Sequence, residues 1–125
     1  MLVAPRPIRY RSGAFSRIVY IRCTSTGMWR VASSAAEAYH DDRTKLPGVK
    51  QFDVYPVFAE SGLGRKDTKN RYPYRLLEVA LLSAFEDAIG ERPRLNRRGP
   101  GSERAAAFAR FGEHRIRSLI RRFSE

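Results

Sequence analysis

The stretch that decides the fold is Tyr74–Ile89, which reads YRLLEVALLSAFEDAI. Its apolar residues recur at spacings of three and four, the period of an α-helix, and nearly every residue is a good helix former. Pro73 suits the first turn of a helix, and Gly90 followed by Pro93 gives a stop signal. Because the apolar residues cover more than half of the circumference, we predict a central helix that is buried on several sides.

The length and composition of the whole chain fit one folded domain. It has 125 residues, of which 42% are apolar and 30% charged, which excludes global disorder. No apolar run approaches the roughly 20 residues that span a bilayer. The first residues contain Arg and Pro where a signal peptide needs an apolar stretch, and the single cysteine, Cys23, excludes an intrachain disulfide. We therefore expect a cytoplasmic, intracellular protein.

The positive charge of the chain is concentrated in three segments. The net charge is +11, and residues 1–33, 61–73 and 92–125 carry +6, +3 and +7, whereas the remaining segments are acidic. Arg outnumbers Lys by 20 to 4, and Arg pairs with phosphate in two-point contacts and stacks on bases. A GC-rich coding bias also explains an excess of Arg over Lys, but it does not set the sign of the net charge. This charge segregation favours a polyanion as the partner.

Upstream of the central helix we expect an arm and a hairpin. Residues 1–16 contain two prolines and three arginines and are predicted to form a flexible basic arm. Residues 17–32 alternate in the manner of strands on either side of a turn, which predicts a β-hairpin. On that hairpin Tyr20 and Arg22 lie on the face opposite the core, where they either stack on nucleic acid or are covered by a helix.

Three further segments lie between the hairpin and the central helix. Residues 34–46 begin with a capping box and are predicted to form a short helix. Residues 49–58 alternate as a strand, and Pro56 places that strand at a sheet edge or at a bulge. Residues 59–73 form a long polar loop with four basic residues, which makes it a candidate binding loop.

After the central helix, an Arg-rich linker leads to an amphipathic helix predicted over residues 103–123. Gly112 costs about 1 kcal/mol relative to Ala inside a helix, so the segment either continues through it as one helix or divides there into two. Together the elements predict a single α+β domain over residues 17–125. Its small antiparallel sheet, a β-hairpin plus one strand, packs against three helices, in the order β-β-α-β-α-α.

The basic segments predict a nucleic-acid-binding protein that contacts the phosphate backbone of DNA or RNA. No motif for base recognition accompanies them. The residues expected to make these contacts are Arg6, Arg9 and Arg11 in the arm, Arg65, Lys66, Lys69 and Arg71 in the loop, and Arg94, Arg97, Arg98, Arg115, Arg117, Arg121 and Arg122 toward the C-terminus.

Two other classes of function use the same charges. A protein-interaction module, of phage or mobile-element type, would direct them at an acidic partner protein or a large complex. A small metal-independent ribonuclease toxin would use His40 or His114 as its proton-transfer group, with Arg stabilising the phosphodiester. No spacing typical of a metal site or a P-loop is present, so we expect no metal and no cofactor. The sequence favours a binding protein over an enzyme.

Overall fold

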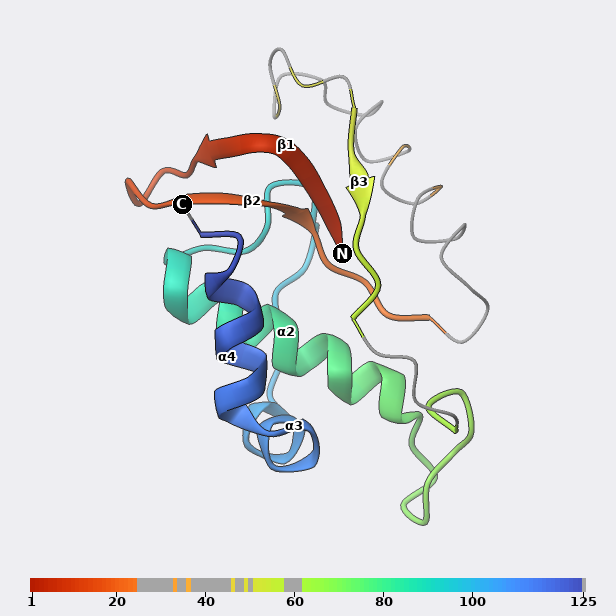
Figure 1. Ribbon diagram of the computed structural model, residues 1–125. Coiled ribbons are helices and arrows are strands. Elements are labelled where there is room, and N and C mark those ends of the chain that lie inside the picture. The colour runs from red at the N-terminus through yellow and green to blue at the C-terminus, as the bar shows by residue number, and fades with distance from the viewer. Residues whose placement is uncertain are drawn as a thin grey trace.

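The structure, a computed structural model, describes residues 1–24, 33, 36, 46, 49, 51–57 and 62–124. Over these residues the chain forms a three-stranded antiparallel sheet and three helices, so the predicted α+β class is confirmed (Figure 1). In chain order the elements, labelled as in Figure 1, are β1 (Leu2–Arg9), β2 (Phe15–Tyr20), β3 (Asp53–Val54), α2 (Pro73–Ile89), α3 (Arg104–Phe111) and α4 (Glu113–Arg121).

Strand β1 lies at the centre of the sheet, between β2 and β3. The prediction of a flexible arm over residues 1–16 is therefore wrong. The chain starts with four buried residues, from Met1 at 5% exposed to Ala4 at 0%, and their burial holds the segment in the sheet. The two prolines that follow are accommodated because the pairing with β2 is irregular between Val3 and Ile8, where no regular ladder requires their missing N–H groups.

The hairpin is displaced from the predicted residues 17–32 toward the N-terminus. It is formed by β1 and β2, and Arg9 pairs with Phe15 near its turn. The predicted second strand, residues 28–32, lies outside the described residues. Strand β3 pairs with β1 and lies at the edge of the sheet, as predicted for residues 49–58, although it is only two residues long.

Both faces of the sheet are covered. One face packs against α2, α3 and α4 in the main core. The other face carries Leu2 and Tyr20, which pack with Leu46 and Leu95 in a second core. Tyr20 is only 8% exposed, so the hypothesis that it stacks on nucleic acid from an open sheet is wrong. The helix predicted over residues 34–46, to which Leu46 belongs, lies mostly outside the described residues.

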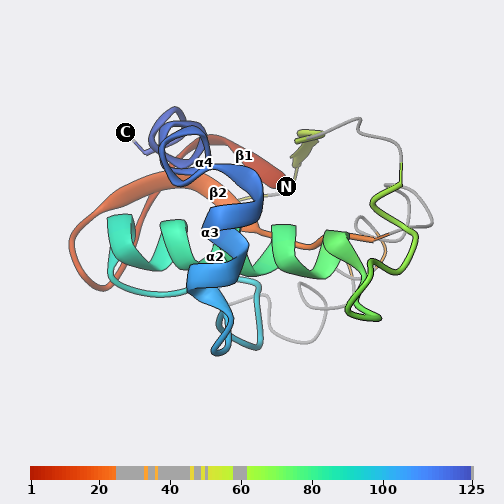
Figure 2. The same ribbon diagram turned by 90° about the horizontal axis from the view of Figure 1, so that it is seen from below.

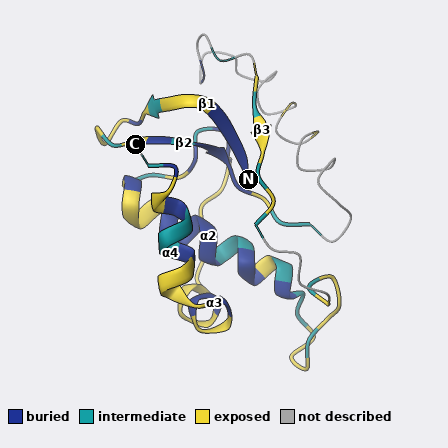
Figure 3. Cartoon of the chain, viewed as in Figure 1, coloured by how far each residue is buried: buried dark blue, intermediate teal, exposed yellow. Residues whose placement is uncertain are grey.

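Helix α2 confirms the central helix predicted from the apolar repeat. It begins at Pro73 and ends at Ile89, and Gly90 caps it with a left-handed backbone (φ of 91°) and an N–H that donates to the carbonyl oxygen of Glu86. Ten of its 17 residues are buried, and Figure 3 shows buried residues along the length of α2. The exposed residues are mainly in its last turns, where Glu86 and Asp87 lie.

The helix predicted over residues 103–123 forms as two helices that divide at Gly112. The φ and ψ of Gly112 are 83° and 105°, a combination that side-chain-bearing residues rarely adopt. Helices α3 and α4 both contact α2 and run in different directions across it (Figure 2). Among the described helices, α2 included, none is long and apolar enough to cross a membrane.

The outer edge of β2 is closed by groups that belong to no strand. The backbone N–H of Leu95 donates to a carbonyl of β2 at 2.9 Å, and the N–H of Arg17 donates to the carbonyl of Phe123 at 2.7 Å. Just beyond the strand, the Asn96 side chain accepts from the N–H of Ile21 and donates to its carbonyl, both at 2.9 Å. The segment after α2 and the end of the chain therefore cover this edge.

Candidate nucleic-acid interface

The loop before α2, residues 62–72, is held in shape by Asp67, and we call it the basic loop. The backbone N–H of Asp67 donates to the carbonyl of Arg71 at 2.7 Å. Its Oδ1 accepts from the backbone N–H groups of Lys69 and Arg71 at 2.9 and 3.0 Å. The hydrogen bond from the Arg71 backbone is the main reason that the pKa of Asp67 lies below its usual value. The carboxylate therefore stays ionised at neutral pH and fixes the backbone of the loop.

Three of the four predicted contact residues in the basic loop are open to solvent. Arg65, Lys66 and Lys69 are exposed, whereas Arg71 is half-buried. The Arg71 guanidinium lies back on the loop, with Nη2 3.3 Å from Oδ2 of Asp67. Arg71 thus helps to build the loop, and the other three cations are displayed by it. Since α2 begins here, the positive end of its dipole adds to their field.

Two half-buried tyrosines lie beside these cations. The rings of Tyr72 and Tyr74 have their centres 5.3 Å apart and are tilted by 33°. Nζ of Lys66 lies 5.5 Å from the centre of the Tyr72 ring, and Cζ of Arg75 lies 6.0 Å from it, within the range of cation–π contacts. Sequence reasoning missed Tyr72, Tyr74 and Arg75, although the alternation of basic and aromatic residues in RYPYR (71–75) was a signal for them.

A second group of cations lies at the turn between β1 and β2, against the C-terminal end of α2. The hydroxyl of Ser12 in this turn donates to the carbonyl of Ile89, the last residue of α2. Arg94 joins the same region, because its Nη2 donates to the carbonyl of Arg9 at 2.8 Å and its guanidinium lies 4.8 Å from the centre of the Tyr10 ring. We call this group the hairpin end; its predicted contact residues are Arg6 within β1, Arg9 at the end of that strand, Arg11 in the turn and Arg94, of which the first three are exposed.

The basic loop and the hairpin end lie at opposite ends of α2 (Figures 1 and 2). A helix of 17 residues separates its ends by about 24 Å at 1.5 Å per residue. In a B-form duplex each strand carries one phosphate per roughly 3.4 Å of helix axis, so this distance measured along the axis covers roughly seven of them. The two groups are too far apart to line one pocket, but their separation fits an extended polyanion.

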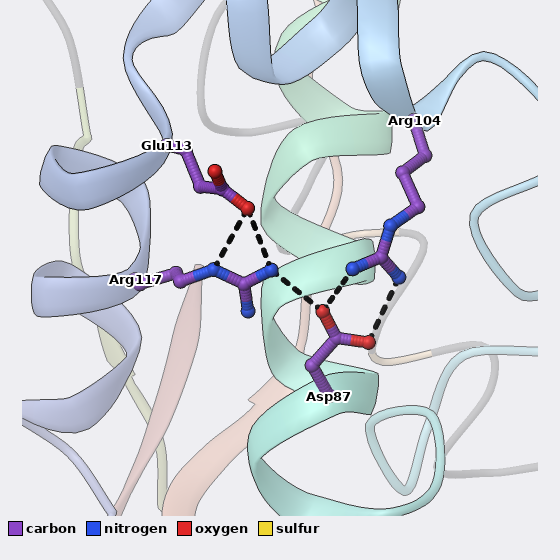
Figure 4. A network of polar contacts seen from close by, with 4 residues as sticks. All are labelled: Asp87, Arg104, Glu113 and Arg117. Atoms are coloured by element: carbon purple, nitrogen blue, oxygen red, sulfur yellow. Dashed lines mark hydrogen bonds and ion pairs between the residues drawn. The ribbon is translucent and has the colours of Figure 1, made fainter.

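Arg117, which the sequence predicts as a phosphate contact, takes part in an ion-pair network (Figure 4). Its Nη2 lies 2.8 Å from Oδ2 of Asp87 and 2.9 Å from Oε1 of Glu113. Arg104 pairs with both carboxylate oxygens of Asp87. The hydrogen bond from Arg104 is the largest cause of the lowered pKa of Asp87, and the one from Arg117 adds to it. The network connects α2, α3 and α4, so the first role of Arg117 is structural.

The other predicted residues toward the C-terminus are spread over two segments. Arg97 and Arg98 are exposed in the linker between α2 and α3, and Arg115 and Arg121 are exposed on α4. Arg122 donates from Nη1 to the hydroxyl of Tyr55 at 3.0 Å, beside β3. These arginines do not join the basic loop, since α4 packs elsewhere on α2 (Figure 1).

In the part of the chain that the structure describes, the candidate catalytic residues do not form a catalytic site. His114 is exposed in the first turn of α4, and the neighbouring Glu113 carboxylate accepts two hydrogen bonds from Arg117. His40 lies outside the described residues. Burial raises the pKa of the Cys23 thiol to about 12, which makes it a poor nucleophile at neutral pH. Within the described ranges, no three His, Cys, Asp or Glu side chains group as a metal site.

Comparison with protein-family models, with curated proteins and with solved structures gave no match. The function is therefore inferred from the basic loop and the hairpin end themselves.

Proposed function

We propose that this protein binds nucleic acid through the phosphate backbone, with the basic loop as its principal contact. The observation that carries the proposal is a loop whose shape is fixed by Asp67 while Arg65, Lys66 and Lys69 remain exposed. A loop that is already ordered loses little conformational freedom when it binds. Its cations are thus presented to a partner at a low entropic cost.

The charge balance of the described residues supports the same function. They contain 20 Lys and Arg but only eight Asp and Glu. Three of the eight acids, Asp67, Asp87 and Glu113, are already occupied in ion pairs with arginines. The remaining positive field attracts a polyanion over a long range at low salt.

The hairpin end supplies a second contact on the same ligand. Its distance of about 24 Å from the basic loop suits a chain of phosphates better than a compact anion. Contacts from Arg and Lys to phosphates position a protein but carry no sequence information. We therefore infer binding that depends little on base sequence.

Salt dependence tests the proposal directly. If the six exposed cations of the two groups meet phosphates, affinity should fall about 10³-fold between 50 and 200 mM salt. Fluorescence anisotropy with a labelled DNA duplex and a labelled RNA strand measures this slope. A shallow slope, or no binding at 50 mM, would refute the proposal and assign the cations to an acidic protein partner. The six residues are Arg6, Arg9, Arg11, Arg65, Lys66 and Lys69.

A pair of variants with equal charge change locates the contact. Lys69→Ala removes an exposed cation from the basic loop, and Arg110→Ala removes an exposed cation from α3. Loss of one phosphate contact lowers the slope of log K against log salt by about 0.9. We expect this change for Lys69→Ala and not for Arg110→Ala. Equal effects of both variants would mean that net charge, and not the basic loop, drives binding.

A further inference from the structure

The basic loop carries one feature that phosphate contact does not use, the pair of rings of Tyr72 and Tyr74. Both tyrosines are half-buried, whereas Tyr10 and Tyr20 are only 2% and 8% exposed and belong to the cores. Neither Tyr72 nor Tyr74 belongs to the main core. The part of the ring pair that is open to solvent can therefore meet a ligand.

The hydroxyl groups point to the same difference between the tyrosines. The hydroxyl of Tyr10 donates to the carbonyl of Ile18 at 2.7 Å, and that of Tyr55 accepts from a guanidinium at 3.0 Å. Tyr72 and Tyr74 make contacts of another kind, because Lys66 and Arg75 lie over the Tyr72 ring and Tyr74 interacts electrostatically with Arg22. The backbone also holds Tyr74, whose N–H donates to a carbonyl of the basic loop at 3.2 Å.

We propose that Tyr72 and Tyr74 form a stacking platform for an unpaired nucleobase, so that the preferred ligand is single-stranded nucleic acid. This inference rests on the proposed function and adds the class of ligand. Aromatic side chains bind single strands by stacking on their bases, while a basic groove follows the backbone. In a duplex the faces of the bases are already stacked on each other and are not offered to a protein ring.

The cations beside the rings fit this mode of binding. Nζ of Lys66 lies 5.5 Å from the centre of the Tyr72 ring, and Cζ of Arg75 lies 6.0 Å from it. A base that stacks on the platform places its own phosphate close to these charges. The same cluster then supplies both a stacking contact, which is insensitive to salt, and an ionic contact, which is sensitive to it.

The test compares Tyr72→Leu with Tyr72→Phe, which keeps the ring. The probes are a polythymidine strand of about 16 nucleotides and a DNA duplex of the same length, each at 50 and 200 mM salt. Loss of one stacked base is expected to weaken single-strand binding about 5- to 150-fold for Tyr72→Leu, at both salt concentrations. Tyr72→Phe and the duplex affinity of both variants should remain close to the wild type.

A second readout separates stacking from any change in the fold. A 2-aminopurine base in the single strand loses fluorescence when it stacks on a ring, and this quenching should disappear with Tyr72→Leu and persist with Tyr72→Phe. Unchanged quenching, or an equal loss of single-strand and duplex affinity in Tyr72→Leu, would overturn the platform while backbone binding stands. Failure of the wild type to bind either probe at 50 mM would overturn the proposed function and the platform together.

Discussion

Replacing Asn96 by alanine is expected to destabilise this protein more than the loss of an exposed polar side chain would. Asn96 is buried, and its amide forms two hydrogen bonds of 2.9 Å with the backbone N–H and carbonyl of Ile21. Ile21 itself is 0% exposed, so water does not replace these partners after the substitution. Asn96→Ala therefore leaves a donor and an acceptor buried without hydrogen bonds.

The expected loss follows from the number of groups left unpaired. Each buried, unsatisfied backbone group costs about 1–3 kcal/mol, so the two groups of Ile21 together cost roughly 2–6 kcal/mol. A domain of this size has a total stability of about 5–15 kcal/mol. Asn96→Ala should therefore lower the midpoint of urea denaturation strongly. Arg98→Ala, an exposed change two residues away, should stay within about 0.5 kcal/mol of the wild type.

An acid at the same position provides a further control. In Asn96→Asp the ionised carboxylate would be desolvated and would face the carbonyl of Ile21, which raises its folded pKa above the unfolded value of about 3.9. The stability of this variant should then fall as pH rises from about 4 toward the folded pKa, because the protonated acid still donates and accepts. Circular dichroism during urea titrations at pH 3.5 and pH 7 measures both effects. A loss below about 1 kcal/mol for Asn96→Ala would refute the role assigned to the amide.

Three further predictions concern ionisable groups. Burial raises the pKa of Glu78, so the charged form of this side chain lowers the stability of the protein above its usual pKa. Glu78→Gln should therefore raise the free energy of unfolding at pH 7 and have little effect at pH 3.5. A lower free energy of unfolding at pH 7 would contradict this reasoning. The arginines around Asp87 lower its pKa, so Asp87→Asn should cost about 1 kcal/mol at pH 7; this cost should vanish as pH falls through the folded pKa, as urea titrations at low salt would show. The Cys23 thiol, with a pKa of about 12, should react with a thiol reagent at pH 8 roughly a thousandfold more slowly than in the urea-unfolded chain, and equal rates would show that the site is open.

The elements that could be predicted from the sequence are those in which one local signal dominates. The apolar repeat of residues 74–89 defined α2 without help from the rest of the chain. Strand β1, residues 2–9, could not be predicted, because the prolines and arginines in this segment are typical of a flexible arm. The buried residues Met1–Ala4 form only a short apolar run, which is a weak signal for a strand. These residues stabilise the strand through contacts with β2, α2 and the segments that cover the sheet. Such long-range contacts leave no local pattern in the sequence.

The candidate site likewise has features that the sequence predicts and features that it does not. The basic loop was predicted from its composition and length, but its three-dimensional shape depends on the hydrogen bonds of Asp67, which composition does not reveal. The ion pair of Arg117 with Asp87 could not be predicted, because the two residues lie 30 positions apart in the sequence. The tyrosines of the loop carry no charge, so the charge pattern that predicts the loop gives no sign of them.

The covered edge of β2 has a consequence for the protein during its synthesis on the ribosome. The groups that cover this strand come from Leu95 and Phe123, and Asn96 covers the residue just beyond it, whereas the strand itself begins at Phe15. At 5–20 residues per second, β2 emerges roughly 5–20 s before Phe123 does. During that interval its bare edge is a template for pairing with other nascent chains. Newly made molecules should therefore be most prone to aggregate until the last helix has been synthesised.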